Sequence, residues 1–249
     1  MIRSCLVSAG ILASLPAQAH IVLILPPSGM VDTREVPVTI AFLHPWEQAG
    51  MVMERPEQVS LTVDGVTQDL TGTLTPSTSF GSEAWQMSVP LSRPGVHVLS
   101  LTPTPYWEPD EDVFIRHYTK TYISAFGSDE GWDAELELPT EIVPLTRPFG
   151  LWAGNLFQGI VKRDGEPVPF AEVEVEHFNE TGATVPGEII ITQTVKADGN
   201  GVFSYAAPNA GWWGFAALST ADETMSLDGV DKEVELGAVI WVEFKAWSE

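Results

Sequence analysis

Three of the five histidines in this chain, His20, His44 and His117, have settings that suit a transition metal. Residues Leu15–Pro27 read LPAQAHIVLILPP, and an Ala-x-Ala cleavage pattern ends at Ala19. Cleavage there makes His20 the first residue of the mature protein, so its α-amine and its own imidazole can chelate one ion. One or two further imidazoles complete a nitrogen-rich site of the kind that binds Ni²⁺, Co²⁺, Cu²⁺ or Zn²⁺.

Two predicted strands must carry the other two histidines to this N-terminus. His44 follows the apolar run Val36–Leu43 and directly precedes a proline, which places it at a strand end. His117 lies inside the run Val113–Phe126, where side chains alternate with period two, so it shares a face with Ile115. Because strand ends and central strands of one sandwich can meet near its first strand, we expect His44 and His117 to converge on His20.

The first nineteen residues predict export. Arg3 gives the segment a short, positively charged N-terminal region, and Leu6–Leu15 is the apolar region that follows it. This apolar run is too short to span a bilayer, which needs about 20 residues. The single cysteine, Cys5, lies inside this segment, so the mature chain has no disulfide and no thiolate ligand. We therefore expect residues 1–19 to be a signal peptide, cleaved after Ala19, and the mature protein to be periplasmic.

The charge balance is strongly acidic, with 34 acidic and 12 basic residues and a net charge of −22. Such a surface repels nucleic acid and concentrates cations, so no nucleic-acid partner is expected. The chain has no Gly-rich phosphate loop, no G-x-S-x-G elbow and no H-E-x-x-H pair, and no enzyme is predicted. The acidic runs Glu108–Asp112 and Asp129–Asp133 lack EF-hand spacing and are interpreted as solvated loops.

The hydrophobic pattern is that of an all-β protein. Short runs rich in β-branched residues alternate with Gly, Pro, Asp and Ser clusters, and Asp64-Gly65 and Asp164-Gly165 are typical hairpin turns. This spacing predicts two consecutive immunoglobulin-like or prealbumin-like β-sandwich domains, residues 20–144 and 145–249, joined by an ordered Pro-containing linker over Leu138–Pro148.

The second predicted domain resembles the carboxypeptidase-regulatory-like, or prealbumin-like, sandwich. The residues that carry this resemblance are DGEPVPFAEVEV from Asp164 and TVKADGNGVFSY from Thr194. The resemblance implies a fold, and that module is usually a non-catalytic scaffold.

The whole mature chain resembles the periplasmic components associated with bacterial nickel and cobalt uptake. The blocks HIVLILPPSGMV, AFLHPWEQAGMVMERPE and PNAGWWGFAAL carry it. The resemblance implies an accessory protein that binds Ni²⁺ or Co²⁺ as cargo, with Cu²⁺ or Zn²⁺ as substitutes in vitro, beside the membrane subunit of an importer. The resemblance implies metal-binding roles for His20, His44 and His117, and it implies none for His97 or His177.

Two other classes of function stay open. An N-terminal histidine with a second imidazole also resembles the copper brace of oxidative polysaccharide enzymes, with Tyr118 as a neighbour of the metal. Alternatively, the chain is a structural or interaction module without a metal. Reductant-dependent oxygen consumption by the copper-loaded protein would favour the oxidative enzyme. Absence of any metal affinity in the correctly cleaved protein would favour the structural or interaction module.

Overall fold

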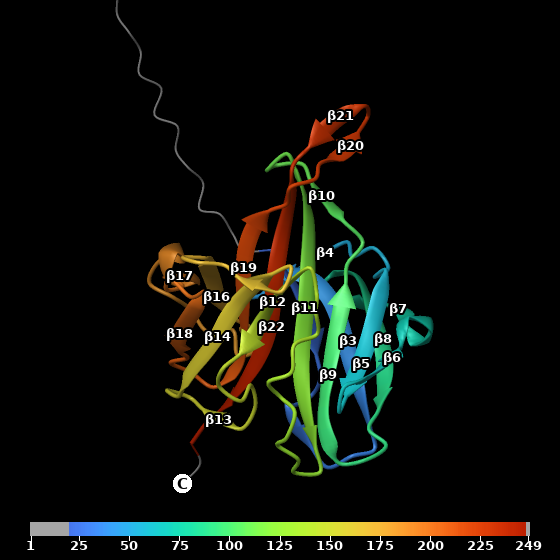
Figure 1. Cartoon of the computed structure of the whole chain (residues 1–249), viewed down its shortest axis with the longest axis vertical. Coiled ribbons are helices and arrows are strands. Elements are labelled where there is room, and N and C mark those ends of the chain that lie inside the picture. The colour runs from blue at the N-terminus through green and yellow to red at the C-terminus, as the bar shows by residue number, and fades with distance from the viewer. Residues whose placement is uncertain (1–19, 248–249) are drawn as a thin grey trace, which may run out of the picture.

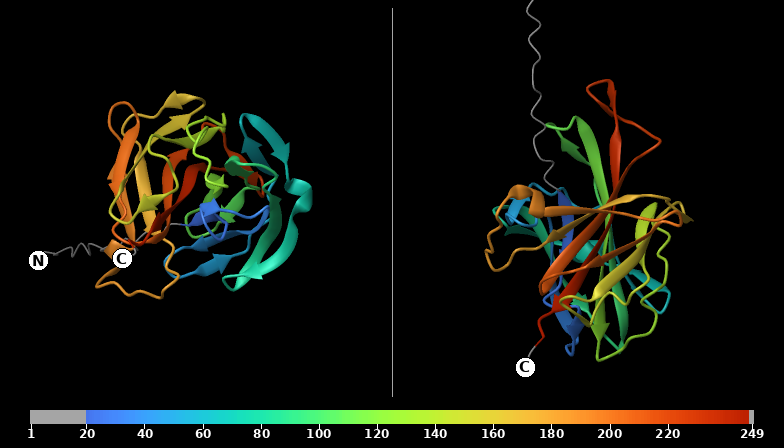
Figure 2. Two further views of the ribbon diagram at one scale, coloured as in Figure 1. Left: turned by 90° about the horizontal axis from the view of Figure 1, so that it is seen from below. Right: turned by 90° about the vertical axis from the view of Figure 1, so that its left-hand side faces the viewer.

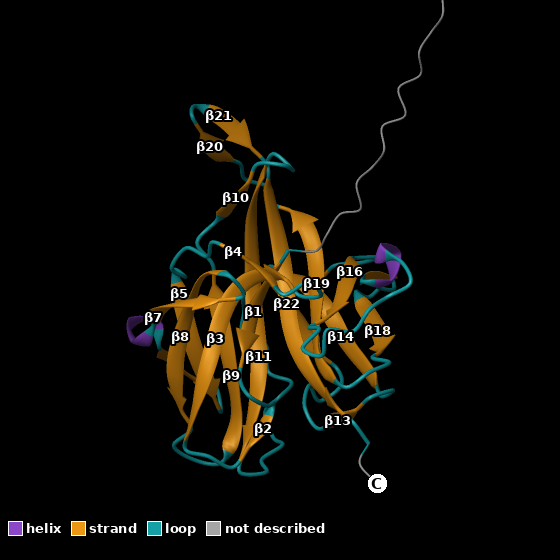
Figure 3. Cartoon of the chain, turned by 180° about the vertical axis from the view of Figure 1, so that it is seen from behind, coloured by secondary structure: helices purple, strands orange, loops and turns teal. Residues whose placement is uncertain are grey.

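The computed structural model describes residues 20–247, and nearly every regular element in that range is a β-strand. The predicted signal peptide, residues 1–19, lies outside the described residues. Two single-turn 3₁₀ helices, Thr71–Thr73 and Glu188–Ile190, are the helical elements of this range (Figure 3). No helix between residues 20 and 247 is long and apolar enough to cross a membrane. The predicted all-β class is confirmed.

One layer of the N-terminal sandwich is a five-stranded antiparallel sheet. Its hydrogen-bonded order is β1–β3–β8–β7, and β4 pairs with β3. The strands are β1 (Ile21–Leu25), β3 (Glu35–His44), β4 (Ala49–Met51), β7 (Thr75–Ser79) and β8 (Ser82–Pro90). The first half of β3 alternates between buried and accessible residues, whereas Ile40–Leu43 is buried throughout. The second half of β3 therefore has both faces covered.

An eleven-stranded sheet runs through both halves of the molecule, in the order β17–β16–β19–β22–β11–β9–β5–β6. Its strands are β5 (Gln58–Val63), β6 (Val66–Asp69), β9 (Gly95–Thr102), β11 (Val113–Ala125), β16 (Glu172–His177), β17 (Thr192–Lys196), β19 (Gly211–Thr220) and β22 (Val234–Lys245), with β2 (Met30–Val31), β10 (Tyr106–Glu108) and β13 (Leu151–Trp152) attached. The strands β11 and β22 pair in parallel at its centre, from Phe114 opposite Val234 to Thr121 opposite Trp241 (Figure 1). The sequence did not predict this shared sheet.

A four-stranded sheet completes the C-terminal sandwich. It contains β12 (Thr140–Pro144), β14 (Leu156–Arg163), β15 (Glu166–Pro167) and β18 (Val202–Ala206), and a separate hairpin is formed by β20 (Met225–Leu227) and β21 (Val230–Lys232). Strand β12 lies inside the predicted linker and pairs with β14, Thr140 opposite Arg163. The strand just before the expected boundary at residue 144 therefore hydrogen-bonds with the second sandwich.

Each sandwich has its own core. The first includes Ile40 and Leu99, and the second includes Phe157, Phe215 and Ile240. Viewed from below, the two sandwiches stand side by side and meet at β11 and β22 (Figure 2). The prediction of two consecutive β-sandwiches is confirmed.

Strand β1 is buried on both faces, between the two halves. Val22 and Ile24 face the first core, whereas Ile21 and Leu23 pack in a third cluster with Trp241. The indole N–H of Trp241 donates to the Val22 carbonyl at 2.9 Å. A strand covered on both faces needs a continuous apolar run, which the sequence IVLIL supplies. This double cover holds β1 in place and fixes the position of His20 immediately before it.

Both predicted Asp-Gly turns are confirmed. Asp64 and Gly65 have φ of 50° and 73°, and Asp164 and Gly165 have φ of 50° and 79°. Two successive positive φ values define the turn whose twist matches a hairpin, and each pair joins adjacent antiparallel strands.

Candidate metal centre

His20 and His44 face each other across the first two paired strands. Strands β1 and β3 are antiparallel, with Ile21 opposite Leu43, so the next pair outward is His20 and His44. Their ring centroids are 4.4 Å apart, with an angle of 51° between the rings. The chain thus brings together two of the three histidines that the sequence predicted to converge.

His117 approaches the same region from the eleven-stranded sheet. Its side chain is only 1% exposed and lies on the face of β11 that is turned toward β1 and β3. The ring of Phe42 contacts the same region, with its centroid 6.1 Å from that of His117 and 6.0 Å from that of His20. A small cavity of about 20 Å³ lies against Phe42 and His117, enough for about one water molecule.

Two carboxylates accompany these histidines, and the sequence analysis did not identify either. Glu108, from β10, is 5% exposed, and its Oε2 lies 3.7 Å from His20 Nε2. Glu235, from β22, places its Oε1 3.1 Å from His117 Nε2. The prediction that the run containing Glu108 is a solvated loop is wrong for this residue. Glu108 is buried beside the imidazole of His20.

Burial favours the neutral forms of His20 and His44. Burial lowers the pKa of His20, and the positive charge of His44 lowers it further. Burial also lowers the pKa of His44. Burial raises the pKa of Glu235, but the hydrogen bond and charge of His117 outweigh it, so that the pKa of Glu235 is lowered on balance. Neutral imidazoles and an ionised carboxylate are the protonation states in which these groups act as ligands.

Two ring nitrogens at this place have no hydrogen-bond partner among residues 20–247. His44 Nδ1 and His117 Nδ1 are both buried, and neither meets a donor or acceptor of this range. Most buried polar atoms in proteins are paired, because an unpaired one loses its hydration without compensation. Unpaired buried nitrogens beside carboxylates fit the donor set of a transition-metal site.

The side chains do not form a closed coordination shell as they stand. Among residues 20–247, no three His, Cys, Asp or Glu side chains lie close enough to share one ion. His20 also continues into a peptide bond on its amino side, so the expected amine ligand is absent from the uncleaved chain. A shared ion therefore requires movement of these side chains.

The two remaining histidines are held by backbone carbonyls elsewhere in the fold. His97 is buried and its Nδ1 lies 3.1 Å from the Gly95 carbonyl. His177 Nε2 lies 3.1 Å from the Ala210 carbonyl, and its ring packs 4.7 Å from that of Trp213. Both rings have local structural partners.

Tyr118 lies on the opposite face of β11 from His117. It packs in a small cluster with Phe114, Val234 and Leu236, and its ring lies 5.6 Å from the Arg116 guanidinium carbon. Tyr118 thus points away from His20 and His44, which is not the placement that a copper-brace neighbour requires.

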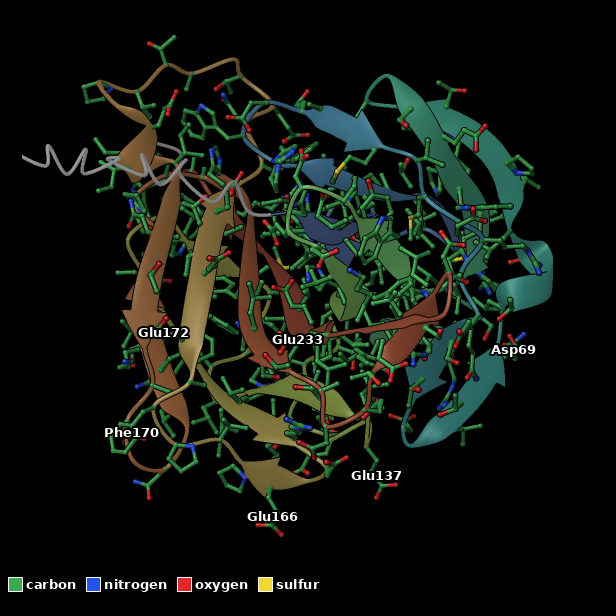
Figure 4. The ribbon with its side chains drawn as sticks, turned by 90° about the horizontal axis from the view of Figure 1, so that it is seen from above. Asp69, Glu137, Glu166, Phe170, Glu172 and Glu233 are labelled. Atoms are coloured by element: carbon green, nitrogen blue, oxygen red, sulfur yellow. The ribbon has the colours of Figure 1, made fainter. Side chains whose placement is uncertain are left out.

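An acidic groove opens beside Glu235. It has a volume of about 320 Å³ and is lined by Glu111, Glu233 and Glu235 together with Val113 and the end of β19. Glu233 lies just before β22 and is labelled near the middle of the view from above (Figure 4). Burial raises the pKa of Glu111, and the charges of Glu235 and Glu108 raise it further. Negative charge is thus concentrated next to the histidines.

The fold and the cluster define an all-β protein of two fused sandwiches with a histidine- and carboxylate-lined site at the start of its first strand. The chain belongs to the family described as domain of unknown function DUF4198, whose model matches residues 17–221. No curated protein matches the sequence. The family description names no metal or transporter, so the expected association with nickel and cobalt uptake stays a prediction.

Solved structures with similar arrangements of strands have low sequence identity. The D0-D1 domain of intimin is 14% identical, with 87% of this chain and 98% of that chain covered and a TM-score of 0.24. A Ca²⁺-stabilised adhesin of an Antarctic bacterium is 13% identical (86% and 44% covered, TM-score 0.25), and a titin I-band fragment is 10% identical (92% and 65% covered, TM-score 0.23). TM-scores this low give no basis for transferring a function.

Proposed function

We propose that the mature protein is a periplasmic accessory protein that binds a divalent transition metal, nickel or cobalt, as cargo and supports its uptake by a membrane importer. The observation that carries this proposal is the pairing of His20 with His44, 4.4 Å apart, at the end of a doubly covered strand. The buried and unpartnered Nδ1 atoms of His44 and His117 support it.

The proposed ligands are the α-amine and imidazole of His20 and the imidazoles of His44 and His117. Nitrogen donors of this kind suit Ni²⁺ and Co²⁺ and also bind Cu²⁺ and Zn²⁺. The amine exists only in a chain cut before His20. Among residues 20–247 no three of these side chains lie close enough to share one ion, so binding includes a shift of side chains.

The position of the site supports a role as carrier of the metal rather than as holder of a permanent cofactor. The His20 side chain is 17% exposed and His44 is half-buried, so one side of the pair meets solvent. A net charge of −22 raises the local concentration of cations around such an opening. An ion at this rim can enter and leave without unfolding of either sandwich, as exchange with a membrane subunit requires.

The test is a calorimetric titration of the chain beginning at His20 with Ni²⁺ and, separately, Co²⁺. We expect saturable binding of one ion, and a loss of at least tenfold in affinity, about 1.4 kcal/mol, in His44→Ala and in His117→Ala. Absence of saturable binding overturns the proposal and favours an interaction module. Oxygen consumption by the copper-loaded protein in the presence of a reductant favours the oxidative enzyme instead.

A further inference from the structure

The most direct contact in the candidate site joins a histidine and a carboxylate from strands about 120 residues apart in sequence. His117 Nε2 lies 3.1 Å from Glu235 Oε1, and the two side chains are 1% and 26% exposed. Both strands lie at the centre of the eleven-stranded sheet. This contact is part of the sheet and does not depend on a mobile loop.

The parallel register of β11 and β22 determines which edge of the imidazole faces the carboxylate. Ile115 lies opposite Glu235, and His117 lies opposite Gly237. A Cβ atom at Gly237 would lie 2.2 Å from His117 Cδ2 and 2.8 Å from its Nε2. The absence of a side chain at Gly237 thus allows the Cδ2–Nε2 edge of the ring to lie against β22.

The opposite edge of the ring carries Nδ1. Because the Cδ2–Nε2 edge lies on β22, Nδ1 is turned away from that strand, and His117 lines the small cavity on the side of Val22 and Phe42. His20 also lies near Phe42, 6.0 Å between ring centroids, and next to His44. The Nδ1 atom is buried and has no hydrogen-bond partner in the part of the chain that the structure describes.

The chemistry of the contact determines where the ring proton lies. An ionised carboxylate can only accept a hydrogen bond, so the His117 nitrogen beside Glu235 must donate. In a neutral imidazole with its proton on Nε2, the other nitrogen carries a lone pair. Metal-ligating histidines commonly donate their second ring nitrogen to a carboxylate in this way, which fixes the ring and strengthens the donor.

We propose that Glu235 is a positioning residue that holds His117 with its proton on Nε2, so that Nδ1 is the atom presented to the cargo metal. Gly237 provides the space for this orientation. The inference rests on the proposed function for its purpose, but the tautomer itself exists in the metal-free protein.

The first measurement therefore uses the metal-free mature protein. Nitrogen-15 NMR that correlates the ring nitrogens with the ring protons identifies the protonated nitrogen of His117, and His117→Gln assigns its signals. We expect the proton on Nε2. A proton on Nδ1 overturns the inference, whether or not the protein binds a metal.

The second measurement compares the affinity of two variants for Ni²⁺ with that of the mature chain. Glu235→Ala removes the acceptor, and Glu233→Ala removes an equal charge from the same groove without touching His117. We expect Glu235→Ala to bind Ni²⁺ about 10–100-fold more weakly and Glu233→Ala to stay within about threefold of the mature chain. Equal losses in both variants overturn the positioning role, because only the charge of the groove would then matter.

A third variant acts through the ring position alone. Gly237→Ala removes no donor or charge but forces His117 off β22. We expect its Ni²⁺ affinity to fall at least tenfold, with the melting curve recorded in parallel. Unchanged affinity in a folded Gly237→Ala protein contradicts the inference. Absence of binding by the unmutated mature chain instead overturns the proposed function and leaves the NMR result to decide the tautomer.

Discussion

Lys120 Nζ lies 2.8 Å from Glu141 Oε2, and both side chains are almost completely buried. Lys120 belongs to β11 and Glu141 to β12, so this ion pair connects the shared sheet to the four-stranded sheet of the second sandwich. The same carboxylate accepts hydrogen bonds from the backbone N–H groups of Leu136 and Glu137. The segment expected as a linker is therefore held by a buried charge network.

Removal of Lys120 should be strongly destabilising. Lys120→Met leaves the buried carboxylate of Glu141 without its cation, and loss of one partner of such a pair typically costs about 3–5 kcal/mol. Urea unfolding at pH 7 measures this. The control is Lys162→Met, whose partner Glu135 is far more exposed, and which should cost no more than about 1 kcal/mol. Similar losses for the two variants would contradict the assignment of Lys120–Glu141 as a structural pair.

The proposed chelate depends on a free amine. One extra glycine before His20 retains every histidine but converts the amine into an amide, and we expect Ni²⁺ affinity to fall at least tenfold, about 1.4 kcal/mol. Titration calorimetry of the extended and mature chains measures the difference. His97→Ala serves as control, because His97 bonds the Gly95 carbonyl away from the cluster. Equal affinity of the two chains would exclude the amine as a ligand.

The pH dependence of metal binding should have two stages. Burial lowers the pKa values of His20 and His44, so these rings stay deprotonated below the usual value of about 6.5. The α-amine, with an ordinary pKa of about 7.7–8.0, therefore accounts for the first loss of affinity as pH falls from 8. The imidazoles of His20 and His44 produce a second loss at pH values below the usual imidazole pKa of about 6.5. A flat profile in Ni²⁺ titrations from pH 8 to 5 would point to carboxylate ligands instead.

Glu176 makes the fold less stable at high pH. Its carboxylate accepts hydrogen bonds from Trp46 N and Thr192 Oγ1, but burial raises its pKa from 4.5 to about 7. The folded state thus binds this proton more tightly than the unfolded state, so the free energy of unfolding decreases as pH rises from about 4.5 to about 7. The difference of 2.5 pKa units corresponds to about 3 kcal/mol at most.

Glu176→Gln mimics the protonated side chain at every pH. We expect it to raise the free energy of unfolding at pH 8 by up to about 3 kcal/mol and to have little effect at pH 4.5. Urea unfolding at both pH values tests this, with Glu172→Gln, an exposed residue of the same strand, as control. An equal effect at both pH values would show that titration of Glu176 is not its cause.

Local patterns predicted the strands and their hairpins well. Apolar, β-branched runs bounded by turn residues located β3 and β11, because such runs depend only on neighbours in sequence. The Asp-Gly turns followed from the backbone preferences of two residues. The proximity of His20 and His44 could be predicted from the sequence, because it depends only on the antiparallel pairing of two strands that are close in sequence, β1 and β3.

Long-range pairing was not accessible from the same patterns. Nothing in the local alternation of the last strand indicates that it pairs in parallel with β11, so the contact of Glu235 with His117 was missed. Glu108 was misassigned for a similar reason, because an acidic run is usually solvated and only the tertiary fold buries its first residue against His20. Both errors concern carboxylates that distant strands bring to the histidines.

The central place of β22 has a consequence for how the chain folds. It is the last strand of the described chain, yet it pairs with β11 on one side and β19 on the other. Closing the pair Phe114–Val234 joins residues far apart in sequence, which makes folding slow relative to local contacts. A chain emerging from its amino end can assemble the first sandwich but leaves one edge of β11 open until residues 234–245 arrive. During that interval the open edge is a template for pairing with other chains, so truncation before β22 should produce aggregation rather than a smaller stable domain.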